Sequence, residues 1–194
     1  MGVRIKNPKE TLWIAGPLLF VLLVRMVRAY ATRLNPAFNW PPVLLGNAFL
    51  AIGWGLGYFL AEADHVFYAT MCDPQDETCR LVKEEWERKN WRNAWGILER
   101  TKGERKRLPI RNMLTIFILL GVGIWVVSSS GSMLASGMVM GLLVRLFSEA
   151  VRDAEYKKWY WVFARDFTPM EHRGFLTAWG LVLLFSLVLL MRGF

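Results

Sequence analysis

The chain has 194 residues, of which 54% are hydrophobic, and these apolar residues are gathered in blocks. That pattern excludes an ordinary soluble domain and predicts one all-α domain, residues 1–194, built as a polytopic membrane bundle of about five spanning helices. The net charge of +8 comes without a nucleic-acid-binding motif. We therefore expect anionic lipid head groups, and no nucleic acid, as partners of the basic residues.

The first apolar block, residues 11–31, predicts the first span. Pro17 lies inside it and is expected to kink the helix. Arg25 and Arg28 lie one turn apart near its far end, where long side chains can reach the lipid head groups.

The second block, residues 43–61, predicts the second span. Gly53 and Gly57 form a small-xxx-small pattern, which is typical of close packing against another helix. Asn47 is a strongly polar residue at mid-depth, and a single Asn in a span usually forms an interhelical hydrogen bond. Because the later spans carry almost no ionisable residue at mid-depth, a transporter or channel ranks last among the functions considered.

A mostly polar segment, residues 62–108, follows the second span. Residues 80–100 predict a helix whose apolar stripe is imperfect. Trp86, Trp91 and Trp95 are interleaved with charged residues in it. Because this helix is too polar to cross a membrane, we predict that its indoles contact lipid or another protein subunit.

Three further apolar blocks complete the predicted bundle. They are residues 110–127, 133–150 and 174–191. The short "SSSGS" turn between the first two makes these helices antiparallel, and Gly137 and Gly141 repeat the small-xxx-small pattern. Residues 154–168 predict an interfacial amphipathic helix, with Trp159 and Trp161 as lipid contacts.

The basic residues predict one orientation in the membrane. Nineteen Lys and Arg lie in the segments on the side of the N-terminus, against three on the other side. The positive-inside rule then places the N-terminus and residues 62–108 in the cytoplasm. Cys72 and Cys79 are accordingly expected to be reduced thiols.

The same topology brings charged residues to one membrane depth, at the cytoplasmic ends of the second, third and fourth spans. Four carboxylates at one depth repel one another unless cations lie among them, so we predict a salt-bridged cluster. Its expected members are Glu62, Asp64, His65, Arg111, Arg145, Glu149, Arg152 and Asp153.

Three motifs carry a resemblance to a known family: "GWGLGYFLAEADHVFY", "ERKRLPIRNML" and "GLLVRLFSEAVRD". Over roughly residues 50–153 the chain resembles small bacterial and archaeal inner-membrane proteins described as membrane-bound metal-dependent hydrolases. The resemblance implies a prokaryotic inner-membrane location and a site at the cytoplasmic face. It also implies catalytic roles for Asp64, His65 and Glu149.

The departures from that family concern its metal ligands. The family has a His before the third span, where this chain has Arg111 or Asn112, and a second His in the fourth span, where this chain has Arg145. Arginine keeps its proton in proteins and cannot bind a metal. We therefore predict a non-catalytic structural or accessory subunit of a membrane assembly, without metal or cofactor. The alternative is a metal-dependent hydrolase of the family type.

Overall fold

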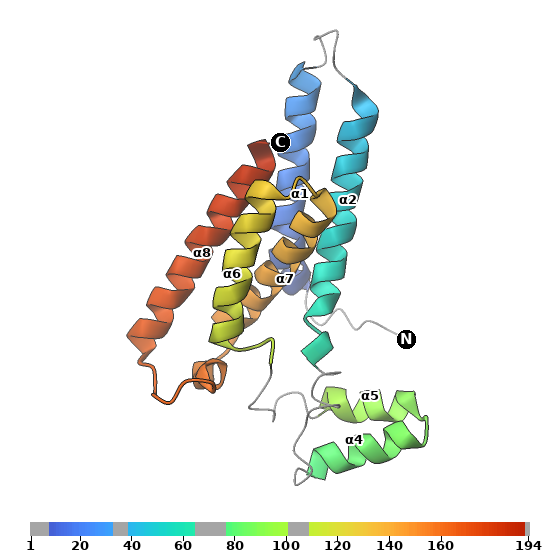
Figure 1. Ribbon diagram of the computed structural model, residues 1–194, viewed down its shortest axis with the longest axis vertical. Helices are drawn as coiled ribbons and strands as arrows, with labels where there is room; N and C mark the ends of the chain where they lie inside the picture. Colours follow the sequence, from blue (N-terminus) through green and yellow to red (C-terminus); the bar gives the residue numbers. More distant parts are fainter. Residues whose placement is uncertain (1–7, 33–38, 65–76, 101–108, 193–194) are drawn as a thin grey trace.

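The computed structural model describes residues 8–32, 39–64, 77–100 and 109–192, and all regular secondary structure in these ranges is helical. Five apolar helices lie together as a bundle (Figure 1). They are α1 (Pro8–Thr32), α2 (Trp40–Leu60), α6 (Met113–Ser129), α7 (Met133–Arg152) and α8 (Pro169–Arg192). The all-α bundle predicted from the sequence is confirmed.

Four of these helices contain an apolar stretch that is long enough to cross a membrane. The stretches are Trp13–Thr32, Trp40–Leu60, Met133–Arg152 and Pro169–Arg192. The fifth apolar helix, α6, is shorter at 17 residues, which corresponds to about 25 Å. Exposed apolar side chains, among them Phe20, Ile52, Phe117 and Leu184, cover the outer faces of the bundle, as a lipid environment requires.

The largest helix–helix interface in the described part of the chain joins α2 to α7. The glycines of the two small-xxx-small patterns face each other's backbone there. A Cβ on Gly57 would overlap the carbonyl oxygen of Met138, and one on Gly141 would overlap that of Trp54. Only hydrogen on these Cα atoms allows so close an approach, which confirms the packing role that the glycine spacing predicted.

Helix α7 occupies the centre of the bundle, since most of its residues are buried, whereas α8 covers it from outside. The ring of Phe147 on α7 meets Trp179 on α8 edge-to-face, with centroids 5.3 Å apart. Phe117 on α6 meets Phe175 on α8 in the same way, at 4.6 Å. These contacts place α8 beside both members of the antiparallel pair α6 and α7.

The helix expected over residues 80–100 is in fact a hairpin of two helices, α4 (Glu77–Glu87) and α5 (Trp91–Arg100). The pair lies beyond the end of α2, with α5 nearer to the bundle (Figure 1). Lys89 has a φ of 55° at the turn, a left-handed conformation that ends a helix. Val82 and Leu98 form the small core between the two helices.

Cys79 is fully buried in this hairpin and is disulfide-bonded, so the expectation of a reduced thiol there is wrong. The other cysteine of the chain, Cys72, lies outside the described residues. Disulfides are typical of oxidising compartments. The bond therefore favours the opposite side of the membrane from the one that the charge count predicts for this segment.

The segment between α7 and α8 also differs in form from its prediction. A five-residue 3-10 helix, η1 (Tyr156–Tyr160), replaces the expected amphipathic helix over residues 154–168, and the chain then runs irregularly to α8. Aromatic ring contacts add to the short-range backbone hydrogen bonds of this turn. Tyr160 stacks on Phe167 with centroids 4.2 Å apart, and its hydroxyl lies 3.0 Å from Nδ1 of His172.

Candidate functional site

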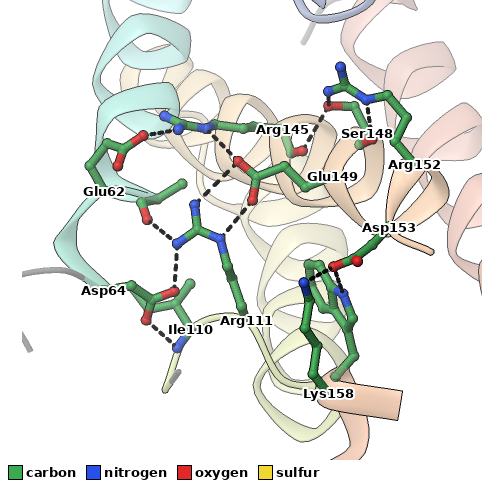
Figure 2. Close-up of polar contacts among 12 residues, drawn as sticks. Glu62, Asp64, Ile110, Arg111, Arg145, Ser148, Glu149, Arg152, Asp153 and Lys158 are labelled. Carbon is green, nitrogen blue, oxygen red and sulfur yellow. Dashed lines mark hydrogen bonds and ion pairs between the residues drawn. The ribbon is translucent and has the colours of Figure 1, made fainter. Parts of the chain in front are cut away.

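Five of the charged residues predicted at one depth meet where α2 ends, α6 begins and α7 makes its last turns (Figure 2). Glu62 and Asp64 follow the last residue of α2. Arg111 precedes Asn112, the N-cap of α6, whose side chain accepts from the Thr115 amide at 2.9 Å. Arg145 and Glu149 lie one turn apart on α7. The site is thus assembled from three segments that are distant in sequence.

The guanidinium of Arg111 is the centre of the cluster. Its Nε donates to Glu149 Oε2 at 2.7 Å and its Nη2 to Glu149 Oε1 at 3.2 Å. Its Nη1 donates to Asp64 Oδ2 at 2.9 Å and to the Ala61 carbonyl at 3.0 Å. One side chain therefore joins the start of α6 to α7 by a bidentate ion pair and to the segment after α2 by a single hydrogen-bonded ion pair with Asp64.

Asp64 is fully buried, and both of its carboxylate oxygens accept hydrogen bonds. Oδ2 accepts from Arg111, and Oδ1 accepts from the backbone amide of Ile110 at 2.7 Å. The carboxylate thus fixes the chain entering α6 against the end of α2.

Arg145 extends the network from α7 to the last turn of α2. Its Nε donates to Glu149 Oε1 at 3.2 Å, and its two terminal nitrogens donate to the Tyr58 carbonyl and to Glu62. The guanidinium also lies 4.2 Å from the centroid of the Tyr58 ring, in cation–π geometry.

Charges alternate along this network, in the order Asp64, Arg111, Glu149, Arg145 and Glu62. The two arginine side chains are only 9% and 7% exposed, so their interactions are screened far less than those of surface pairs. Burial lowers the pKa of Arg111. The nearby carboxylates of Glu149 and Asp64 raise this pKa by more than burial lowers it, so it lies above its ordinary value. Arg111 is therefore a permanent cation.

Arg152 and Asp153 make other contacts among the described residues. Arg152 turns back on its own helix, where Nε donates to the Ser148 carbonyl at 2.8 Å and Nη2 to Ser148 Oγ at 3.0 Å. Asp153 pairs with Lys158 at 2.7 Å, because α7 ends at Arg152 and the extended backbone of Asp153 leaves the helical face. His65 lies outside the described residues.

The geometry does not suit the metal site that the family resemblance implies. Among the described residues no group of three or more His, Cys, Asp and Glu is placed to hold a metal ion. Asp64 and Glu149 would have to share a metal, but the guanidinium of Arg111 lies between their carboxylates (Figure 2). A permanent cation in that position repels a divalent ion and occupies the lone pairs that would bind it.

The tryptophans predicted to contact lipid or a partner differ in exposure. Trp91 and Trp95 on α5 are 55% and 44% exposed, whereas Trp86 packs against the small hairpin core. Trp161 is exposed, but Trp159 is buried, and its indole Nε1 donates to Asp153 at 3.1 Å. The prediction for Trp159 is therefore wrong, because that residue fills the space under the turn after α7.

A second polar site was missed in the sequence. Arg25 on α1 does not extend straight to the lipid head groups: its Nε donates to Asn47 Oδ1 at 2.7 Å and its Nη1 to the Leu190 carbonyl at 2.8 Å. The prediction that Asn47 forms an interhelical hydrogen bond is confirmed. The sequence did carry an indication of the contact between Arg25 and Asn47, because both are polar residues in neighbouring apolar spans.

Comparison of the chain with family models, with curated proteins and with solved structures finds no match. The resemblance to membrane-bound metal-dependent hydrolases therefore stays a prediction that depends on three short motifs. The features of this chain that bear on function are the two polar sites and the exposed indoles of the α4–α5 hairpin.

Proposed function

We propose that this protein is a non-catalytic structural or accessory subunit of a membrane assembly. The network of Glu62, Asp64, Arg111, Arg145 and Glu149, here called the ion-pair cluster, fastens its helices together. The observation that carries this proposal is the position of Arg111 between Asp64 and Glu149, the two described carboxylates that a hydrolytic metal site would need.

The chemistry of the ion-pair cluster supports a structural role. A general base needs a carboxylate that is free to accept a proton from a substrate or a water molecule. The oxygens of Asp64 and Glu149 are instead committed to guanidinium and backbone donors. Arg111 and Arg145 cannot serve as acids or bases near neutral pH.

The α4–α5 hairpin supports an accessory role, because Trp91 and Trp95 present exposed indoles next to charged residues. Such surfaces suit a contact with another subunit or with anionic lipid head groups. Replacing Trp91 and Trp95 together by Ala should weaken that contact and lower the stability of the hairpin only modestly, since both side chains are largely exposed and Trp91 meets the Trp86 ring edge-to-face at 4.4 Å. Unchanged co-purification and unchanged vesicle binding of the double variant would count against the role of the hairpin.

The proposed location is a prokaryotic inner membrane, with the N-terminus and the hairpin in the cytoplasm. The charge asymmetry supports this orientation because positive residues in short flanking segments direct insertion. The disulfide of Cys79 speaks against it. Reporter fusions after residues 105 and 194 should read inside and outside respectively. The reverse result would invert the orientation, and the same side for both would exclude five spans.

Metal analysis of the purified protein tests the main proposal. We expect no stoichiometric zinc, manganese or magnesium, and we expect Asp64→Asn to lower thermal stability because Arg111 loses a buried partner. About one metal ion per chain in the wild type, lost in Asp64→Asn, would contradict this proposal and favour the metal-dependent hydrolase instead. The exposed carboxylate of Asp166 provides the control, since Asp166→Asn should change neither metal content nor stability.

A further inference from the structure

The end of the bundle opposite to the ion-pair cluster holds two arginines whose hydrogen-bond partners, within the described residues, are all neutral groups. Arg25 donates to the Asn47 amide oxygen and to the Leu190 carbonyl, and Arg28 donates to the Met191 carbonyl at 2.8 Å. Both carbonyls belong to the last turn of α8, where a helix leaves its carbonyls without partners. The two side chains thus cap α8 from α1.

These contacts leave most of the positive charge uncompensated. The carboxyl end of a helix carries about half an elementary negative charge, against two full positive charges on Arg25 and Arg28. The sequence supplies no side-chain carboxylate nearby, because residues 26–61, 113–148 and 172–194 contain neither Asp nor Glu. Backbone carbonyls satisfy part of the guanidinium groups at this depth, and their remaining positive charge favours the binding of an anion.

Several hydrogen-bond donors at this site have no acceptor in the described part of the chain. Asn47 is only 8% exposed, and its Nδ2 has no hydrogen-bond partner, although Oδ1 of the same amide accepts from Arg25. Nη2 of Arg25 lies beside Gly46, 3.8 Å from where a Cβ would be. A buried donor without a partner costs about 1–3 kcal/mol, so a ligand with several acceptor oxygens would be stabilised here.

The depth of the site identifies the source of such a ligand. Leu190 and Met191 lie at the end of α8, while α1 and α2 continue beyond it (Figure 1). Thr32, the last residue of α1, follows Arg25 by seven positions, or about 10 Å along the helix. Arg28 is exposed on α1, so its guanidinium can meet lipid. The anion present at the border of the hydrocarbon region is the phosphate of a phospholipid.

We propose that Arg25, Arg28 and Asn47 form a binding site for the phosphate group of an anionic phospholipid, seated between α1 and the end of α8. The phosphate oxygens accept from the free guanidinium nitrogens of Arg25 and Arg28, and Asn47 positions Arg25 by accepting from its Nε. The acyl chains then lie along the exposed apolar faces of α1 and α8. The site differs from a general basic surface because Arg25 is partly buried and both guanidinium groups are held by hydrogen bonds to the protein.

Native mass spectrometry of the full chain tests this site, with phosphatidylglycerol and phosphatidylcholine as probes. We expect retained phosphatidylglycerol on the wild type, and about a tenfold loss of retention in the double variant Arg25→Gln/Arg28→Gln, as for one lost charged contact of about 1.4 kcal/mol. The double variant Lys157→Gln/Arg165→Gln removes the same charge from exposed side chains at the other end and should retain the lipid.

Three outcomes would overturn the proposal. One is equal retention of the two lipids by the wild type, and another is equal loss of phosphatidylglycerol in both double variants. The third is displacement of the lipid by inorganic phosphate at millimolar concentration, which would assign the site to free phosphate. Should the Arg25 variants fail to fold, Arg28→Gln alone serves, because Arg28 is exposed; unchanged retention in that variant would also contradict the site.

Discussion

The two ends of the bundle use the same side chain with different partners. At one end Arg111 and Arg145 bind the carboxylates of Asp64, Glu149 and Glu62. At the other end Arg25 and Arg28 bind an amide oxygen and two backbone carbonyls. Both sets link helices that are distant in sequence, but only the first set carries its own counter-charges. An arginine paired with carboxylates has its charge neutralised within the protein and links the helices. An arginine bound to neutral acceptors keeps its positive charge and can still bind an anion.

The largest effect is expected from removing the centre of the ion-pair cluster. Arg111→Ala leaves Asp64 buried beside Glu149 with no guanidinium between them, and breaking a buried pair in this way costs about 3–5 kcal/mol. Thermal unfolding in detergent should show a strong loss of stability. Arg165→Ala provides the control, because its pair with Glu171 is exposed and worth at most about 1 kcal/mol. Equal effects of both variants would contradict the difference in burial.

The second effect concerns the glycine interface that joins the two ends. Gly57→Ala places a Cβ against the Met138 carbonyl, so α2 must move away from α7, at a cost of about 1–3 kcal/mol. Because Tyr58 follows Gly57 directly on α2 and Glu62 comes just after the end of that helix, that movement should also weaken their contacts with Arg145. Gly55→Ala is the matched control, since a Cβ there meets nothing within 4 Å. Similar unfolding temperatures for the two variants would exclude the glycine interface as a constraint.

The third prediction concerns a substitution that gives Arg25 a carboxylate partner, as Arg111 and Arg145 have at the other end of the bundle. Asn47→Asp would give Arg25 a carboxylate at the position of the present amide oxygen, 2.7 Å from Nε. A new buried ion pair is close to neutral for stability, so the unfolding temperature in phosphatidylcholine should change little. The stabilisation that phosphatidylglycerol gives the wild type should disappear. Undiminished stabilisation of this variant by phosphatidylglycerol would show that Arg25 does not hold the lipid phosphate.

Much of this fold could be predicted because its causes are local. Blocks of apolar residues define the spans, and the spacing of Gly53 and Gly57 defines a close contact. The break between α4 and α5 had a weaker signal: the interval from Trp86 to Trp91 is five residues, which no single helix face accommodates. The left-handed conformation of Lys89 could not be predicted, since neither Pro nor Gly marks that turn.

The sites were predictable to different degrees for a similar reason. The ion-pair cluster follows from topology, because the charged residues lie at span ends that one side of the membrane must share. The partner of Arg25 depends on which helix lies beside α1, and α8 comes from the far end of the chain. No spacing in the sequence encodes that neighbour. Asp153 was placed in the cluster because a continuous helix was assumed past Arg152, where α7 in fact ends.

The smallest effect is a pH dependence at Asp153, which lies beside the ion-pair cluster but outside it. Partial burial raises the pKa of its carboxyl, but hydrogen bonds from Lys158, Trp159 and the Glu155 amide outweigh burial and hold the pKa below its ordinary value of 3.8. Folding therefore favours the charged form. The contribution is complete above the unfolded pKa and is lost as the pH falls through the lower folded value. Unfolding temperatures of the wild type and Asp153→Asn should differ at pH 7 and converge as the pH falls below about 4. A difference that persists unchanged into strong acid would show that Asp153 stabilises the turn after α7 by packing and not by its charge.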